Sequence, residues 1–348
     1  MSIPPKQTDK VKVSGVILVD KPYGMTSQQV VSKVKYLFKS PIHNSKKAGH
    51  TGTLDPMATG LLPICLGEAT KFSHYQLDAD KAYQATILLG SQTDTGDAEG
   101  QIVKTIPVPK FDEADLEEIA QRFLGAQQQI PPMYSALKKD GKKLYEYARA
   151  GIEVERLPRD IIIKAIDLKA LDNEQIQLMV TCTKGTYVRV LGEDIAKAMG
   201  TLGHLSALRR LKVGRFDIDN AVTLSALETQ TLDSRQAQLM PVDACIDIDM
   251  SLTLTAEQCK RIHMGQRLNV FAQLTDKLRD YISNKVSNEL SINIDKFTHD
   301  ESDDIVNTRL LEHEIPIDIR LIDEQGQFLG LGAVSLNGRL QPKKLIQR

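Results

Sequence analysis

The stretch KKAGHTGTLDPMATGLLPICLGEATK, residues 46–71, determines how the rest of the chain is interpreted. It places a single carboxylate, Asp55, before a proline, and His50 lies five residues earlier in the same loop. Because a proline restricts the preceding residue to extended backbone angles, the Asp55 side chain should project in a fixed direction. Gly49 and Gly52 can adopt left-handed angles, and their missing side chains let another backbone approach closely. A lone Asp-Pro pair is typical of a turn, but a stiff loop with one reactive group indicates a functional site.

Composition and length predict a two-domain protein with a substantial core. The chain has 348 residues, of which 41% are hydrophobic and 26% charged, and this length exceeds the usual range of one domain. The four cysteines are far apart without a CxxC pair, and the seven histidines show no HxxxH or HxH spacing. This pattern is typical of thiols in a reducing compartment and predicts neither a disulfide framework nor a metal site. The polar N-terminus and the lack of a run of ~18 apolar residues predict a soluble, cytoplasmic protein without membrane association.

The charge distribution indicates a nucleic-acid partner, although the net charge is only −1. Residues 1–47 contain nine lysines and only two acidic residues, and 205–215 contain four basic residues and no acidic one. The compensating acidic residues gather in 94–118 and 289–324. Charge sorted in this way is the pattern expected for one phosphate-binding face. The alternative is a set of solvated faces that merely alternate in sign.

Residues 14–245 alternate strands and helices without a clean βαβ repeat. Helix 26–38 places apolar residues on one face behind a hydroxyl N-cap, and helix 111–125 begins with acidic residues and ends at a glycine. The stretch SQTDTGDAEG, residues 91–100, suits a hairpin turn and lacks the ligand spacing of a calcium loop. Most strands are joined by turns, so the pattern predicts an α+β fold with a mixed, mostly antiparallel central sheet and flanking helices. The expected strands are 14–22, 61–67, 81–90, 159–171, 175–182 and 205–216, and the other expected helices are 68–76 and 186–200.

A second domain is expected to begin where the pattern resets, around 241–250. The C-terminal segment contains two hairpin signals, EQGQ and LNGR, and a small β-barrel fits this pattern. Residues 274–314 are polar and acidic with little apolar periodicity, so we expect a flexible insertion there. The expected domains are therefore 1–245 and 246–348.

The run GHTGTLDPMATGLLPICLGEATK resembles the signature motif of the TruB family of tRNA pseudouridine-55 synthases. Five further segments match the family in the same order, so the resemblance covers essentially all of residues 14–245. It implies a pseudouridine synthase fold for 1–245, a thumb-like insertion at about 125–155 that closes on the T-stem loop of tRNA, and a PUA-like RNA-binding β-barrel domain at 246–348. The longer acidic insertion departs from the compact bacterial pattern. The matching segments are GVILVDKPYGMTS, DKAYQATILLGSQTDTGDAEGQI, IPPMYSALKKDGKKLYEYARAGIEV, CTKGTYVRVLGEDIAKAMG and HLSALRRLKVGRF.

The resemblance also implies an activity, the isomerisation of uridine 55 in the T-loop of tRNA to pseudouridine. The reaction detaches uracil from C1′ of the ribose, rotates it, and rejoins it through C5. It involves no redox change and no group transfer, so the resemblance implies no cofactor. Because an enzyme that flips this base must loosen and re-form the tRNA elbow, assistance in tRNA folding is a compatible second activity.

Three residues match catalytic positions of the family. Asp55 matches the catalytic aspartate, and a carboxylate can attack C1′ or C6 as a nucleophile and leave again; the sequence does not decide between these carbons. Tyr83 matches a tyrosine whose ring would stack on uracil and whose hydroxyl would serve proton transfer. Arg189 matches the arginine that pairs with the aspartate and keeps it ionised. By pattern alone, Tyr83 would be a core residue of a strand and Arg189 a surface residue.

Four further positions match residues of the family's substrate site. Tyr187 and Leu208 match residues that line the uracil pocket, although each would otherwise be interpreted as core. His50 matches a histidine that stacks where the flipped nucleotide stood, with a general-base role as the weaker alternative. Lys21 matches a position that is either structural or faces a phosphate.

Two other functions are compatible with the sequence. One is an RNA-binding or RNA-folding protein that uses the same surfaces without chemistry, and the other is a relative that depends on a guide RNA. The thumb-like insertion and the small PUA-like domain favour an enzyme that acts on tRNA without a guide RNA. Nothing in the pattern requires oligomerisation, so we expect a monomer.

Overall fold

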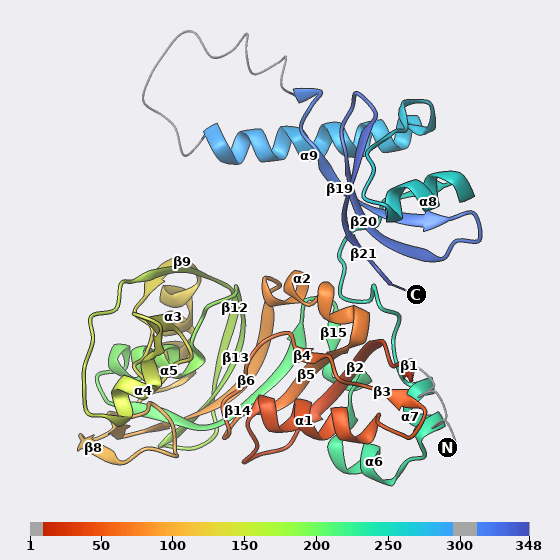
Figure 1. Cartoon of the computed structure of the whole chain (residues 1–348). Helices are drawn as coiled ribbons and strands as arrows, with labels where there is room; N and C mark the ends of the chain where they lie inside the picture. The colour runs from red at the N-terminus through yellow and green to blue at the C-terminus, as the bar shows by residue number, and fades with distance from the viewer. Residues whose placement is uncertain (1–9, 295–311, 348) are drawn as a thin grey trace, which may run out of the picture. The chain divides into compact units, whose positions relative to one another are not determined.

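The computed structural model describes residues 10–294 and 312–347, and the chain divides into two compact units, Met1–Cys245 and Ile246–Arg348 (Figure 1). Within the described residues, the first unit is built on a ten-stranded sheet. Most neighbouring strands are antiparallel, and the pairs β5–β14 and β16–β2 are parallel. This confirms the predicted α+β fold with a mixed, mostly antiparallel sheet. The order is β16 (Val222–Thr223), β2 (Gly15–Lys21), β5 (Thr59–Leu66), β14 (Gly203–Val213), β6 (Lys81–Leu89), β13 (Gln175–Cys182), β12 (Arg159–Ala170) and β9 (Gly125–Gln129), with β4 (Ala48–His50) on β5 and β15 (Phe216–Asp217) on β14.

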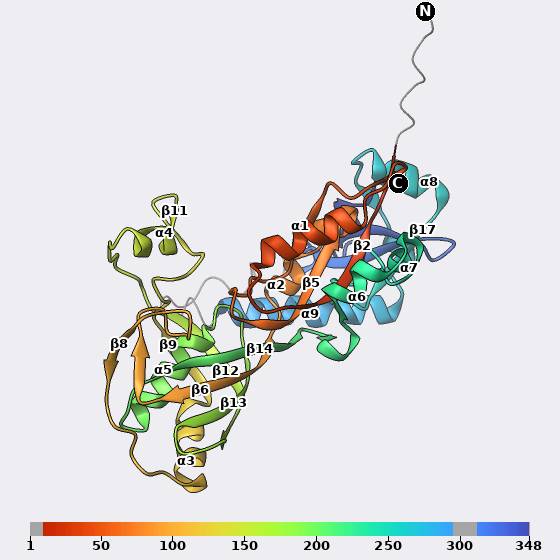
Figure 2. The same ribbon diagram turned by 90° about the horizontal axis from the view of Figure 1, so that it is seen from below.

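Helices pack on the two halves of this sheet through separate hydrophobic clusters. On β2 and β5 lies α1 (Ser27–Leu37), which starts at a capping box between Thr26 and Gln29, as the hydroxyl N-cap predicted. On the half formed by β6, β12, β13 and β14 lie α3 (Glu113–Phe123) and α5 (Val188–Ala198). Figure 2 shows the two groups of helices apart from each other. Each half therefore has its own core.

The two halves meet where β5 runs beside β14. This parallel contact is short, with only two aligned pairs, Thr59 with Arg209 and Gly60 with Arg210. Gly60 has φ +102°, and a Cβ atom there would lie 2.3 Å from the carbonyl oxygen of Arg210. Only glycine lets the two backbones approach this closely. We call this contact the sheet seam.

An arm leaves the sheet between β9 and β12 and projects away from it (Figure 2). It contains a lysine-rich hairpin followed by a short helix, and its residues are mostly exposed. The elements of the arm are β10 (Lys138–Lys139), β11 (Lys142–Lys143) and α4 (Leu144–Arg149). The remaining elements of the first unit are β1 (Val11–Lys12), β3 (His43–Asn44), η1 (Gly67–Lys71), α2 (His74–Leu77), β7 (Ser91–Thr93), β8 (Ile102–Thr105), η2 (Ile218–Asn220), α6 (Leu224–Thr229) and α7 (Leu232–Ala237).

The second unit is a curled, five-stranded sheet in the part of the chain that the structure describes, and it forms half of a barrel (Figure 1). Both predicted hairpin turns are present, with Gly326 and Gly338 at positive φ. No helix within 10–294 or 312–347 is long and apolar enough to cross a membrane. The elements are β17 (Ser251–Leu254), α8 (Ala256–His263), β18 (Leu268–Asn269), η3 (Phe271–Gln273), α9 (Asp276–Ile294), β19 (Ile317–Asp323), β20 (Phe328–Val334) and β21 (Arg339–Leu345).

Helix α9 corrects the expectation of a flexible insertion over 274–314. Residues 276–294 are helical, and Leu278, Ile282 and Val286 are buried in the core of the second unit. Their spacing of four residues forms one helical face, which is hard to recognise because polar residues surround it. Residues 295–311 of the expected insertion lie outside the described residues.

The buried face of α9 can be tested with Ile282→Asp. Because the substitution removes a fully buried apolar side chain and introduces a charge, we expect the free energy of unfolding of the second unit to fall by about 3–5 kcal/mol. Urea denaturation followed by circular dichroism measures this change. The control, Asn284→Asp, adds the same charge at an exposed position of the same helix. Equal midpoints for the two variants would show that α9 is not part of the core.

Candidate active site

The loop between β4 and β5, residues 51–58, carries Asp55 and is held by hydrogen bonds to Ser27, the first residue of helix α1. The Ser27 hydroxyl donates a hydrogen bond to the Leu54 carbonyl oxygen (3.0 Å) and accepts one from the Leu54 N–H (2.8 Å). Ser27 is buried, so no water competes for these two bonds. One hydroxyl therefore fixes both backbone groups of the residue that precedes Asp55.

Two cations hold the rest of this loop. Lys21 is fully buried, and its Nζ donates to the carbonyl oxygens of Pro22 (2.9 Å) and Pro56 (3.2 Å). Arg210 donates from Nη2 to the carbonyl oxygen of Gly52 (3.0 Å). Burial lowers the pKa of Lys21 to about 8, and the nearby Asp55 charge partly offsets this effect. Of the two alternatives for Lys21, this burial and these contacts favour the structural one over a contact with a phosphate.

Gly49, in β4 just before the loop, and Gly52, within the loop, have different backbone conformations. Gly52 has φ +142°, as expected, and lies against the Arg210 guanidinium. Gly49 lies in β4 without a positive φ, and nothing would crowd a Cβ atom there. Gly49 therefore does not use the left-handed angles that a glycine permits, because it pairs with Cys65 in a regular antiparallel ladder.

Arg189, near the start of α5, forms an ion pair with Asp55, with 3.0 Å between Nε and Oδ2. Its side chain is only 5% exposed, whereas that of Asp55 is 39% exposed. The other guanidinium nitrogens donate to the carbonyl oxygens of Thr95 (2.6 Å) and Tyr134 (2.7 Å), and Nη1 lies 3.5 Å from Asp97 Oδ2. A buried cation is tolerated only when such partners surround it. The guanidinium is therefore fixed inside the protein, and the Asp55 carboxylate is the member of the pair that solvent reaches.

Asp97 is part of this site, although the sequence pattern assigned it only to a hairpin turn. It is 4% exposed, and its Oδ1 accepts hydrogen bonds from Thr95 Oγ1 (2.6 Å) and the Glu99 N–H (3.1 Å). These bonds hold its second oxygen toward Arg189. No local signal could have shown this, because the same Asx-type bonds occur in ordinary turns.

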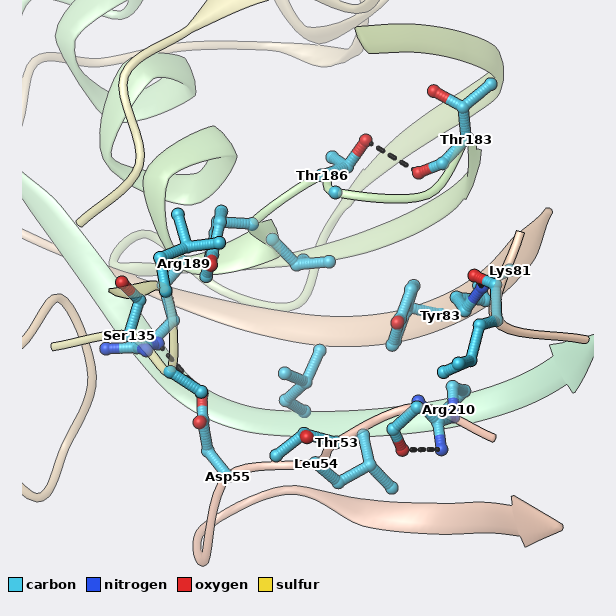
Figure 3. A pocket seen from close by; sticks show the side chains of 18 residues that line it. Thr53, Leu54, Asp55, Lys81, Tyr83, Ser135, Thr183, Thr186, Arg189 and Arg210 are labelled. Carbon is cyan, nitrogen blue, oxygen red and sulfur yellow. Dashed lines mark hydrogen bonds and ion pairs between the residues drawn. The ribbon is translucent and has the colours of Figure 1, made fainter. Parts of the chain in front are cut away.

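Asp55 and Arg189 lie at a pocket of about 330 Å³ between loop 51–58, the start of α5, and strands β6 and β14 (Figure 3). This size is typical of small-molecule sites. Five of the seven predicted site residues line it: Asp55, Tyr83, Tyr187, Arg189 and Leu208. Lining residues that the sequence did not predict include Lys81, Ser135 and Arg210. The pocket is therefore built from segments that lie far apart in the chain.

The inner end of the pocket is buried and cationic. Burial raises the pKa of Tyr83, while the charge of Arg210 opposes this shift, so the phenol is protonated at neutral pH. Burial, together with repulsion from Arg210, lowers the pKa of Lys81 to about 8. Lys81 donates to the carbonyl oxygens of Leu77 (3.0 Å) and Ala79 (2.5 Å). Figure 3 shows Tyr83 and Arg210 at the end opposite the Asp55–Arg189 pair.

His50 does not line the pocket; it lies in β4, just before the loop. Burial, together with the charge of Arg210, lowers its pKa, so the imidazole is neutral at pH 7. Its Nδ1 accepts a hydrogen bond from the Gly52 N–H (3.3 Å), which leaves the ring proton on Nε2. A neutral, half-buried ring suits stacking, and the distance from the pocket does not favour a general base.

Among the residues that the structure describes, no group of three or more His, Cys, Asp or Glu side chains could hold a metal ion. The polar groups that line the pocket include the Asp55 carboxylate, the buried cations and the Tyr83 hydroxyl. This set can attack an electrophilic carbon, stabilise a carboxylate and exchange a proton.

Comparison with known proteins agrees with this fold. A chain of an H/ACA ribonucleoprotein bound to a substrate RNA containing 2′-deoxyuridine shares the fold, with a TM-score of 0.61 and 18% identity over 96% of this chain and 85% of that one. Residues 39–188, which include most of the mixed sheet and Asp55, match the N-terminal domain of the TruB family of pseudouridylate synthases. Residues 189–247 and 314–346 match two C-terminal domains of the same family.

Relatives from bacteria extend the match to nearly the whole chain. The tRNA pseudouridine synthase B of Psychrobacter cryohalolentis is 73% identical over 97% of this chain and 95% of its own length. The protein of the same name from Methylobacillus flagellatus is 42% identical over 97% of both chains. This chain belongs to the TruB family of pseudouridylate synthases, which confirms the resemblance stated from the sequence.

Ser27→Ala tests whether the clamp on Leu54 positions Asp55. The substitution leaves two buried backbone groups without partners, so the loop should shift, and we expect the rate of pseudouridine formation to fall about 10- to 100-fold. Single-turnover kinetics measure this rate. Ser32→Ala, at an exposed position of the same helix, is the matched control and should leave the rate unchanged. A wild-type rate in Ser27→Ala would show that the loop is held without the clamp.

Proposed function

We propose that this protein isomerises uridine 55 in the T-loop of tRNA to pseudouridine. Its relatives named tRNA pseudouridine synthase B, up to 73% identical over nearly the whole chain, support the substrate. The observation that carries the chemistry is the ion pair between the half-exposed Asp55 carboxylate and the buried Arg189 guanidinium at the pocket. An ionised, fixed carboxylate is the group that the reaction requires.

The reaction is a rearrangement within one nucleotide. The bond between N1 of uracil and C1′ of ribose breaks, and a bond between C5 and C1′ forms. The proton on C5 is removed and N1 gains a proton, so substrate and product have the same composition. This balance requires no cofactor. Asp55 acts as the nucleophile in this proposal, and it departs again when the new bond is complete.

The other pocket residues would bind the uracil ring, transfer protons and orient Asp55. Tyr83, Tyr187 and Leu208 line the walls and would hold the uracil ring by stacking and apolar contact. The protonated Tyr83 hydroxyl can supply the proton that N1 gains, and the phenolate left behind can then accept the proton that C5 loses. Arg189 holds the Asp55 carboxylate in one direction through their ion pair.

Access to the base requires that the nucleotide leaves its stack, which costs a few kcal/mol. His50 lies next to the catalytic loop as a neutral ring and would stack in the vacated place. Such a contact recovers about 1–3 kcal/mol. Because this opening and re-forming of the tRNA elbow is itself a refolding event, the same protein would also assist tRNA folding.

The arm within 125–155 would act as a thumb on the T-stem loop. Its cations lie over its own tyrosine rings, with Lys142 over Tyr147 at 6.0 Å and Lys143 over Tyr145 at 5.4 Å. Clustered cations and aromatic rings suit phosphates and splayed bases. In this proposal residues 1–245 form the catalytic domain, residues 246–348 form a PUA-like RNA-binding domain, and the protein acts as a cytoplasmic monomer.

Asp55→Asn separates catalysis from RNA binding. The amide keeps the shape of the side chain but is not a nucleophile, so pseudouridine formation on tRNA should fall by at least about 10³-fold. The dissociation constant for tRNA, measured by filter binding, should remain within a few-fold of the wild-type value. If this variant still formed pseudouridine, the assignment of the nucleophile would be refuted. If the wild-type protein bound tRNA but formed no pseudouridine, a binding role alone would be favoured.

The likeness to an H/ACA ribonucleoprotein chain makes a guide-RNA-dependent enzyme the second candidate. Incubation of the purified protein with an unmodified tRNA transcript, followed by mapping of pseudouridine, distinguishes the two. We expect modification at uridine 55 without any added RNA, and tRNA affinity that falls steeply with salt, with a log–log slope of about −0.7 to −0.9 per phosphate contact. Modification only after a second RNA is added would support the guide-dependent alternative.

A further inference from the structure

Gln129 connects the base of the arm to the helix that carries Arg189. It is the last residue of β9, directly before the arm, and it is buried. Its Nε2 donates to the Tyr187 carbonyl oxygen (3.1 Å), and its Oε1 accepts from the Tyr187 N–H (2.7 Å). One side-chain amide thus satisfies both backbone groups of a residue 58 positions away.

These two bonds take the place of a side-chain N-cap, which is missing at the start of α5. Tyr187 is the N-cap of this helix, and its side chain makes no capping hydrogen bond. Helix starts are normally fixed by a Ser, Thr, Asp or Asn side chain at this position. Here the position of the first turn, which carries Arg189, is fixed from outside by Gln129.

A second link joins the same two segments a few residues later. The guanidinium of Arg189 donates to the carbonyl oxygen of Tyr134, in the first part of the arm. Pro131 and Pro132 lie between the two links, and proline restricts both its own φ and the residue before it. The segment 129–134 is therefore a stiff bridge that is attached at both ends to residues 187–189.

From this geometry we infer that Gln129 is a positioning residue for the Asp55–Arg189 ion pair. It does not itself line the pocket, and it acts through the backbone of Tyr187, which does, by holding the start of α5 at a fixed distance from the base of the arm. The orientation of Arg189 thereby becomes coupled to the position of the arm. This inference rests on the proposed function, because it assigns Gln129 to the same reaction.

Gln129→Leu removes both hydrogen bonds and keeps the approximate size of the side chain. We expect the single-turnover rate of pseudouridine formation on a tRNA transcript to fall about 10- to 100-fold, since a misplacement on the order of 1 Å costs up to ~10²-fold. The dissociation constant for the same transcript should stay within about two-fold. Gln128→Leu is the matched control, because this exposed amide of the same strand bonds only to Asp160 and its loss should leave the rate unchanged.

Gln129→Glu adds a readout that a merely structural role would not produce. An ionised carboxyl at this position cannot donate to the Tyr187 carbonyl oxygen, whereas a protonated one can. The rate relative to wild type should therefore rise as the pH is lowered. The charged groups that act on Tyr187 are Arg159, Arg189 and Asp55, and all three are present in both proteins, so the ratio isolates the introduced group.

The outcomes are separable. Loss of rate in Gln129→Leu with retained binding, together with a pH-dependent ratio in Gln129→Glu, supports the inference. A wild-type rate in Gln129→Leu, a loss confined to the dissociation constant, or a ratio that does not change with pH overturns it. If wild-type protein forms no pseudouridine in tRNA, the proposed function fails instead. Should Gln129→Leu not fold, the pH profile of Gln129→Glu decides alone.

Discussion

The buried guanidinium of Arg189 is the constraint on which the rest of the catalytic unit depends. A cation that is 5% exposed destabilises a fold unless each of its donors has a partner. The partners of Arg189 come from three places: Asp55 in loop 51–58, Thr95 and Asp97 in the acidic turn, and Tyr134 at the base of the arm. These segments must converge on the start of α5 for the protein to fold. The pocket is the space that this convergence encloses.

This arrangement explains why the Asp55 loop is stiff. Three side chains bond to its backbone: the Ser27 hydroxyl at Leu54, the Lys21 ammonium at Pro56, and the Arg210 guanidinium at Gly52. None of these three occupies the carboxylate, which pairs with Arg189 instead. Asp55 combines a fixed main chain with a side chain that is 39% exposed, which is the combination that a nucleophile approaching a flipped nucleotide requires.

The sequence predicted the parts of this structure that have local patterns. Strands, helix α1 with its N-cap, and the mixed sheet followed from periodicity and turn residues, and the motif identified Asp55, Tyr83, Tyr187, Arg189 and Leu208, which share one pocket. It did not predict Asp97, Ser27 or Gln129 as parts of the site. Their partners lie as far as 92 residues away in the case of Asp97 and Arg189, and a side chain that bonds to a remote backbone leaves no periodic signal. Helix α9 was missed for another reason, because its three buried residues are spread among polar ones.

The sheet seam gives the molecule a mechanical property. Two aligned pairs join β5 to β14, whereas seven join β2 to β5 and nine join β14 to β6, so the sheet is most compliant along one line, which runs beneath loop 51–58. Each half has its own core, so bending along this line would leave both cores intact. Arg209 on β14 donates two hydrogen bonds to Asp20 on β2, across the intervening strand β5. Bending of the sheet along the seam would stretch these two bonds. A ligand bound to both halves at once would therefore act across the sheet seam, where Arg210 of the pocket lies.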